Sequence, residues 1–240
     1  LSGRYLGQPR AFSFTFGFER ANVRNAFVPR LWASRRIAML VDEVRQAGAS
    51  SAAMPATPAQ LRSGEPRLRE LTDEILRLST RFGILTEYTA FLATDGTDLA
   101  NKEALILGCS TNLRSRAVQD RSGLSAVNQG LNLKSQREQG WVNNDNRYFD
   151  AEMKEVAIYS VQQVCDRAFF RRGDQWIDAR LFEGVIRLEP DEIVTWGSDR
   201  FHDIARRLTA QGRPGVLSLT GASSILMLFD GRVVRIDSPC

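Results

Sequence analysis

A stripe of apolar residues between positions 66 and 82 limits the folds open to this chain more than any other pattern. The stripe recurs at steps of three and four residues and consists of Leu68, Leu71, Ile75, Leu78 and Phe82. This spacing predicts an amphipathic helix, and Gly83 supplies the usual stop. A similar pattern begins at Pro29, which suits a first helical turn, and runs to about Ala47. Because each helix must bury one face, the sequence predicts two packed helices, over about 29–47 and 66–82.

Strand patterns flank these helices. Residues 10–19 alternate strictly and place four phenylalanines on one face, namely Phe12, Phe14, Phe16 and Phe18. Alternation with a period of two predicts a half-buried strand, and residues 2–6 supply a hairpin partner across a turn at Gly7. The phenylalanine face is either part of the core or a surface for an apolar ligand or another chain. Residues 84–93 predict a further strand that leaves the second helix almost without a linker.

The C-terminal part combines hairpins with one helix. Its predicted strands cover 156–170, 175–178, 181–188, 215–219, 225–229 and 233–236. Gly173 marks a hairpin turn, and the Asp230-Gly231 pair between two apolar runs is the strongest hairpin signal in the sequence. Ser198 is a good N-cap for a helix that runs through Leu208.

Together these elements predict the α+β class. We expect antiparallel, β-sandwich-like strands with the two packed helices, followed by a C-terminal α/β hairpin unit. The predicted segments are a strand and helix-pair segment over 1–96, an irregular partner-contact segment over 97–150, and a β-rich segment with one helix over 151–240. The 240 residues suffice for a sizeable core, and no run approaches the roughly 18 apolar residues of a membrane-spanning helix.

Residues 97–150 are expected to be extended and weakly regular, with some helix over 99–107 and around 121–138. Asparagine and glutamine dominate from Asn128 to Asn146. A non-repetitive stretch of this length in a compact domain is commonly functional. We therefore expect partner contacts from Arg114, Arg116, Arg121, Trp141, Asn143 and Asn144. A deletion of 110–147 is expected to abolish partner binding and leave the core folded.

Arginine dominates the basic residues. Of the 32 basic residues only three are lysines (Lys102, Lys134 and Lys154), and 28 acidic residues leave a net charge of +4. Arginine suits bidentate phosphate recognition, so an Arg-mediated binder of nucleic acid or of an anionic surface is the alternative function. However, the arginines are spread along the chain, and codon bias in a GC-rich genome produces the same excess. We therefore expect protein partners and no nucleic acid.

The sequence carries no recognisable catalytic or metal-binding motif. His202 is the only histidine, and no Gly-x-Ser-x-Gly elbow or phosphate-binding glycine loop accompanies it. Residues 95–98, Asp-Gly-Thr-Asp, put two carboxylates beside a hydroxyl, but a turn is the stronger interpretation. Cys109, Cys165 and Cys240 are too widely spaced for a paired metal motif, although the first two could form a disulfide in an oxidising compartment. We predict a protein that is not an enzyme and that uses no cofactor or metal.

One stretch resembles a known family. Leu31-Trp32-Ala33 opens the first helix, and after a variable loop and the second helix the chain continues Gly83-Ile84-Leu85-Thr86-Glu87-Tyr88-Thr89. This arrangement is similar to the segment that follows the von Willebrand A domain in VIT/vWA proteins, the family of the inter-alpha-trypsin inhibitor heavy chains. The resemblance covers about 22–94 and, more loosely, 121–236. The residues that carry it are Leu31, Trp32, Ala33, Gly83, Thr86 and Thr89, whereas Glu87 stands where the family usually has proline.

The resemblance implies the C-terminal part of a VIT/vWA-like protein that acts in protein–protein association. It suggests an accessory subunit of a larger assembly at the cell envelope, in the periplasm or outside the cell rather than in the cytoplasm. Because the chain starts at Leu1 on strand-like sequence, we expect an A domain upstream, which mass spectrometry of the native protein would detect. The family's Asp-x-Ser-x-Ser metal motif is absent from these 240 residues, so the resemblance carries over no metal ligand.

Overall fold

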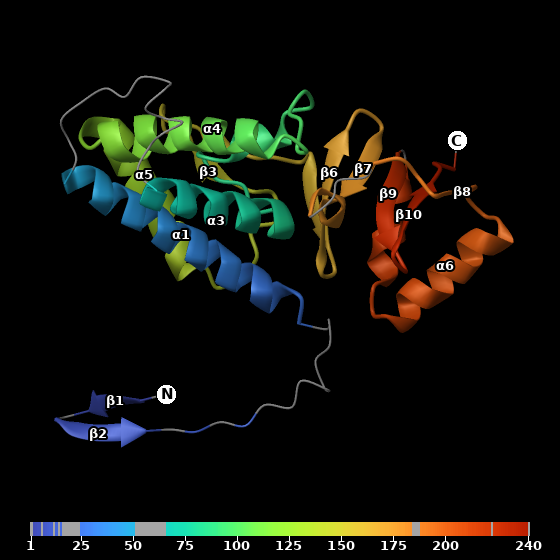
Figure 1. Ribbon diagram of the computed structural model, residues 1–240, viewed down its shortest axis with the longest axis horizontal. Helices are drawn as coiled ribbons and strands as arrows, with labels where there is room; N and C mark the ends of the chain where they lie inside the picture. The colour runs from blue at the N-terminus through green and yellow to red at the C-terminus, as the bar shows by residue number, and fades with distance from the viewer. Residues whose placement is uncertain are drawn as a thin grey trace.

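A layer of helices lies against one face of a six-stranded mixed sheet, and a further helix covers the opposite face (Figure 1). The computed structural model describes residues 2–5, 7–11, 13, 15, 25–50, 66–183, 188–221 and 223–239. The helices are α1 Phe27–Ser50, α3 Pro66–Phe82, α4 Lys102–Asn112, α5 Gly123–Glu138 and α6 Asp199–Ala210. The short helices are η2 Ala90–Ala93, the π-helix η3 Leu113–Gln119, η4 Ala179–Phe182 and η5 Pro214–Thr220. The strands are β1 Ser2–Tyr5, β2 Gln8–Ala11, β3 Tyr148–Phe149, β4 Glu155–Val156, β5 Val161–Val164, β6 Arg167–Arg172, β7 Gln175–Asp178, β8 Glu192–Val194, β9 Ser224–Phe229 and β10 Arg232–Ile236. The predicted α+β class is confirmed.

The two predicted helices are confirmed as α1 and α3, which pack against each other. α1 buries Ala33, Ile37 and Val41, and α3 buries Ile75 and Leu78 in the same core. Both helices follow the apolar stripes of the sequence, because burying a stripe at helical spacing is what stabilises an amphipathic helix.

The prediction of an irregular segment over 97–150 is wrong. α4, η3 and α5 occupy most of this range, and Leu113, Ala117 and Leu133 belong to the core shared with α1 and α3. The partial predictions of helix over 99–107 and 121–138 correspond to α4 and α5. A deletion of 110–147 would remove part of the core, so it cannot separate partner binding from folding as the sequence suggested.

The main sheet has the strand order β5-β6-β7-β9-β10-β8. It is mixed, because β7 pairs with β9 and β10 pairs with β8 in parallel, whereas the other pairs are antiparallel. The expected antiparallel, sandwich-like arrangement is therefore replaced by one open mixed sheet. Residues 181–182 belong to η4 and 215–219 to η5, so these predicted strands are wrong in the described chain.

The predicted hairpin turns are confirmed. Gly173 has a φ of 53° between β6 and β7, and Asp230 and Gly231 have φ values of 48° and 78° between β9 and β10. Two successive positive φ values match the twist of a hairpin, and asparagine, aspartate and glycine tolerate them best. β1 and β2 also pair as an antiparallel hairpin across Gly7, whereas the four-phenylalanine face lies outside the described residues.

The sheet separates two parts of the core. Ala168 and Phe170 of β6 face the helical layer, whereas Phe169 and Trp176 face α6. This follows from strand geometry, since successive side chains point to opposite faces. On the α6 side, Ser198 Oγ accepts a hydrogen bond from Phe201 N, which confirms the predicted N-cap.

The predicted strand over 84–93 is wrong, because turns and η2 occupy this range. Thr86 N donates to Thr89 Oγ1 at 3.1 Å, and Thr89 N donates to Thr86 O at 3.0 Å. Threonine side chains can offer the backbone an alternative to a strand ladder, and here they close a turn. Leu85 N donates instead to the Asn146 side chain. The apolar run remains buried, but without strand pairing.

Candidate functional site

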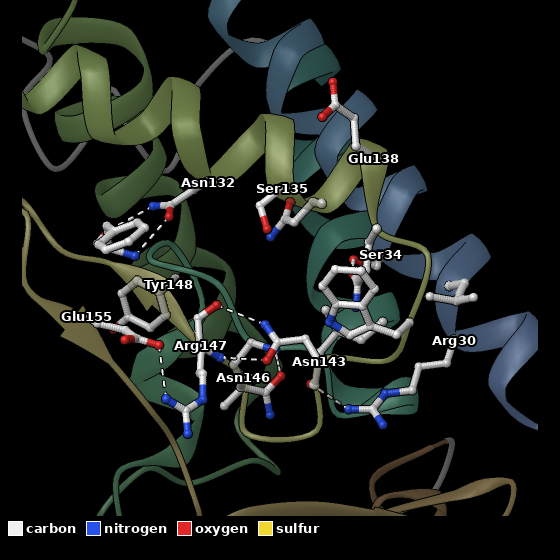
Figure 2. Close-up of a pocket in the computed structure, with 17 residues that line it drawn as sticks. Arg30, Ser34, Asn132, Ser135, Glu138, Asn143, Asn146, Arg147, Tyr148 and Glu155 are labelled. Atoms are coloured by element: carbon white, nitrogen blue, oxygen red, sulfur yellow. Dashed lines mark hydrogen bonds and ion pairs between the residues drawn. The ribbon is translucent and has the colours of Figure 1, made fainter.

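A pocket of about 470 Å³ opens between α1, α5 and the connection that follows α5 (Figure 2). α1 contributes Arg30 and Ser34, α5 contributes Ser135, and the connection contributes Trp141 and Asn146. Cavities of about this size commonly hold small ligands. The lining combines aromatic rings with amides and guanidinium groups, so the pocket suits a ligand that has both an apolar body and polar ends.

The inner face of α5 carries asparagine side chains that form hydrogen bonds with the backbone of residues 149–150. Phe149 N donates to Asn132 Oδ1 at 2.8 Å, and Asn132 Nδ2 donates to Phe149 O at 2.8 Å (Figure 2). Asn128 donates in the same way to Asp150 O, and the neighbouring Gln129 is also fully buried. These side chains supply the hydrogen bonds that a neighbouring strand would otherwise give to residues 148–150. Buried amides of this kind are satisfied, and they fix one wall of the pocket.

The outer face of α5 exposes three apolar side chains, next to which Lys134 and Glu138 are also exposed. Leu124, Val127 and Leu131 have 58%, 56% and 42% of their surface exposed. Their spacing of three and four residues puts them on one face, which we call the α5 stripe. A surface helix usually buries its apolar side chains and exposes its polar ones, whereas α5 buries the amides of Asn128 and Asn132 beside Leu133 and exposes these three apolar side chains. The stripe continues to the pocket, because Ser135 follows Leu131 by one turn and lines the pocket.

Arg30 is a buried guanidinium that has no acidic partner in the described part of the chain. It is 7% exposed, Nη1 donates to Asn144 Oδ1 at 2.7 Å, and Nη2 donates to Asn143 O at 3.0 Å. Both acceptors are neutral. Burial lowers the pKa of Arg30 to about 9, which reflects a positive charge that the surroundings compensate poorly. The group is still charged at neutral pH.

Asn146 lies beside Arg30, because Asn146 N and Arg30 Nη2 both donate to the Asn143 carbonyl. Asn146 has a φ of 47° and is only 2% exposed. Its Oδ1 accepts a hydrogen bond from Leu85 N at 2.8 Å, whereas its Nδ2 has no acceptor. Buried amide groups are rarely left unpaired, so this donor needs an explanation.

The structure brings together three of the six predicted contact residues. Trp141, which is 80% exposed, and Asn143 line the pocket, and Asn144 holds Arg30. The three predicted arginines lie elsewhere. Arg116 forms a buried ion pair with Glu87, Arg121 Nη1 donates to Arg45 O, and Arg114 is half-buried in η3.

The residues of the family resemblance divide between core and surface. Ala33 is fully buried and Leu31 lines the pocket, but Trp32 is 53% exposed and meets Phe82 edge to face. Trp32 therefore lies on the exposed side of α1. The remaining three residues, Gly83, Thr86 and Thr89, are buried at the junction between α3 and the sheet.

The described residues hold no group of three or more His, Cys, Asp or Glu side chains that could bind a metal ion. His202 is exposed on α6 beside Phe201. In the 95–98 turn, Asp95 Oδ1 accepts from Gly173 N and Asp98 Oδ1 accepts from Ala100 N, so both carboxylates serve the backbone. Cys109 and Cys165 are free thiols.

Within the described chain, no helix has the length and apolar character needed to cross a membrane.

Many of the arginines form ion pairs with aspartate or glutamate. Arg180 and Arg213 share Asp166, at 2.7 Å from each guanidinium, and Arg200 pairs with Glu192 at 2.6 Å. These pairs neutralise the arginines locally. Such an arrangement does not favour a continuous phosphate-binding surface.

Comparisons with family models, with curated proteins and with solved structures gave no match to this chain. The resemblance to VIT/vWA proteins therefore stays a prediction.

Sequence reasoning missed Arg30, Asn132 and Asn146, and it missed the reversed polarity of α5. A signal for α5 was present, because Leu124, Val127 and Leu131 share one helical face and the buried amides share another. No comparable signal marked Arg30 or Asn146, which are 116 positions apart and share the Asn143 carbonyl only in the folded chain.

Glu87 is a buried carboxyl that contacts Asn132 of α5. Its Oε2 lies 2.5 Å from Arg116 Nη2, and its Oε1 accepts a hydrogen bond from Asn132 Nδ2 at 3.0 Å. Burial raises the pKa of Glu87 above its usual value, because desolvation outweighs the hydrogen bond from Asn132 and the charge of Arg116.

We expect Glu87→Gln to change how stability depends on pH. The folded state holds the Glu87 proton more tightly than the unfolded state does, so this carboxyl stabilises the fold below its unfolded pKa and loses that contribution as pH rises through its folded pKa. Glutamine does not titrate. The unfolding free energy of the variant relative to wild type should therefore increase as pH rises above about 4, as measured by urea denaturation. A relative stability that decreases over this range would mean that Arg116 lowers the pKa of Glu87, contrary to our account.

Proposed function

We propose that this chain is a non-enzymatic protein–protein interaction module whose contact surface is the α5 stripe. The observation that carries the proposal is the reversed polarity of α5, which buries Asn128 and Asn132 and exposes Leu124, Val127 and Leu131. Exposed apolar side chains gathered on one helix face mark a binding site more often than scattered ones do. Helices of this kind dock into apolar grooves through residues spaced by three, four and seven positions.

The wider assignment rests on the sequence resemblance alone. On that basis we propose that the chain is the C-terminal part of a VIT/vWA-like protein, an accessory subunit of an assembly at the cell envelope. The alternative partner, nucleic acid or another polyanion, has less support because ion pairs such as Arg200 with Glu192 neutralise many arginines. Polyanion binding is one of the outcomes that the test distinguishes.

The test is affinity capture from the native host with quantitative mass spectrometry, comparing wild type with the double variant Val127→Glu and Leu131→Glu. Both side chains are exposed, so the variant should fold, and two carboxylates on the stripe should prevent apolar docking. Ile193→Glu is the matched control, because Ile193 is 55% exposed on β8 and lies outside the stripe.

We expect one or more proteins to be enriched by wild type and by the control and lost with the double variant. Equal recovery by all three would refute the proposed surface. Binding to a heparin column that weakens steeply with salt, unchanged by the double variant, would favour the polyanion alternative.

A further inference from the structure

We propose that the pocket beside α5 binds a carboxylate carried on a flat apolar body, with Arg30 and Asn146 as its anchors. The inference goes beyond the interaction surface and rests on different residues, so either can fail without the other.

The first argument is charge. Arg30 projects from α1 toward the connection after α5, where its hydrogen bonds go to the Asn144 side chain and the Asn143 carbonyl (Figure 2). A guanidinium is almost always ion-paired when buried, yet the partners of Arg30 among the described residues are the neutral Asn143 and Asn144. An incoming carboxylate would supply the missing counter-ion and could bind the planar guanidinium through two parallel hydrogen bonds.

The second argument is the unpaired amide. Asn146 Nδ2 lies in the pocket wall without an acceptor, while its Oδ1 is fixed by Leu85 N. The backbone N–H of Asn146 and Arg30 Nη2 share the Asn143 carbonyl, so the unpaired donor and the uncompensated cation belong to one end of the pocket. A carboxylate has lone pairs for both donors.

The carboxylates already in the pocket do not compete for Arg30. Glu155 Oε1 accepts from Arg147 Nη1 at 3.0 Å, and Arg147 also pairs with Asp145. Glu138 lies on the opposite side of the pocket from Arg30 (Figure 2). The anionic groups are therefore either neutralised or distant.

The shape of the ligand follows from the remaining walls. Trp141, Tyr148 and Phe149 line the pocket together with Ile84 and Leu85. A pocket that combines rings and aliphatic side chains with anion-binding donors suits an aromatic or extended apolar acid. Such a carboxylate can belong to a free organic acid or to the C-terminus of a peptide.

The experiment measures binding of two pairs of probes to the intact chain by isothermal titration calorimetry. The first pair is indole-3-acetate and its neutral counterpart indole-3-acetamide, and the second is the peptide Ala-Ala-Phe with a free or an amidated C-terminus. We expect at least one acid to bind saturably and its amide to bind at least about tenfold more weakly. Binding of only the first acid would indicate a free organic acid, and binding of only the peptide would indicate a peptide terminus.

Two variants locate the site. Arg30→Met and Asn146→Asp should each weaken binding of the acid at least about tenfold, because one removes the cation and the other replaces the donor with an anionic oxygen. Arg35→Met is the matched control, since Arg35 is an exposed arginine on α1 that donates to Gln139 O and does not line the pocket. Equal affinity of acid and amide, or no saturable binding of either acid up to about 10 mM, would overturn the proposal. The comparison of acid with amide uses wild type alone, so it holds even if a variant fails to fold.

Discussion

Asp178→Asn should lower the unfolding free energy of this protein by about 3 kcal/mol or more, because it leaves Arg167 as a buried charge without its counter-ion. Arg167 Nη1 lies 3.0 Å from Asp178 Oδ2, and the two side chains are only 4% and 0% exposed. Nη1 also donates to the Leu228 carbonyl of β9 at 2.9 Å, so the pair joins β6, β7 and β9. Asparagine keeps the shape of the side chain and the oxygen that accepts from Arg180 N. The expected loss is therefore electrostatic.

Urea denaturation measures this loss, and two controls separate charge from packing. The double variant Arg167→Met and Asp178→Leu removes both charges and should be less destabilised than the sum of its single variants. Arg69→Gln breaks an exposed pair with Glu103 and should cost less than about 1 kcal/mol. An Asp178→Asn protein within about 1 kcal/mol of wild type would show that the buried pair does not act as described.

Gly83→Ala should destabilise the fold by about 3 kcal/mol, because two penalties combine at this position. Gly83 has a φ of 59°, a conformation that side chains with a Cβ rarely adopt. A Cβ there would also lie 3.0 Å from Ala168 Cβ and 3.1 Å from Val161 Cγ1, which are packed positions of the sheet. Gly83 therefore lies at a close approach between the end of α3 and the sheet.

Gly173→Ala is the matched control for this prediction. Gly173 has a similar φ of 53°, but a Cβ there would meet nothing within 4 Å. It should cost only the backbone strain, about 1 kcal/mol. If urea denaturation shows that the two variants lose the same unfolding free energy, the close approach of Gly83 to the sheet does not contribute to the cost of the substitution.

The sequence predicted best where a local rule decides the structure. The helical stripes of α1 and α3, the N-cap at Ser198 and the Asp230-Gly231 turn depend on neighbours within a few residues, and all are confirmed. Prediction failed where side chains, and not another strand, satisfy the backbone. Thr89 Oγ1 accepts from Thr86 N and closes a turn in place of the predicted strand, and Asn132 binds the backbone of Phe149, 17 positions away, in the range expected to be irregular.

The candidate site was predictable only in part for the same reason. Trp141, Asn143 and Asn144 were expected to contact a partner, and they do lie at or beside the pocket. The charge that gives the pocket its proposed specificity comes from Arg30 on α1, which no local pattern connects with residues 143–146. Arg116 was also expected to contact a partner. In the structure its guanidinium forms a buried ion pair with Glu87 instead.

The central claim is that a protein partner covers the outer face of α5. The most direct measurement is the dissociation constant of the captured partner, after purification, for wild type, Val127→Glu and Ile193→Glu. We predict that Val127→Glu weakens binding at least about tenfold while Ile193→Glu leaves it unchanged, because only the first introduces a charge into the α5 stripe. Equal dissociation constants for all three proteins would contradict the account.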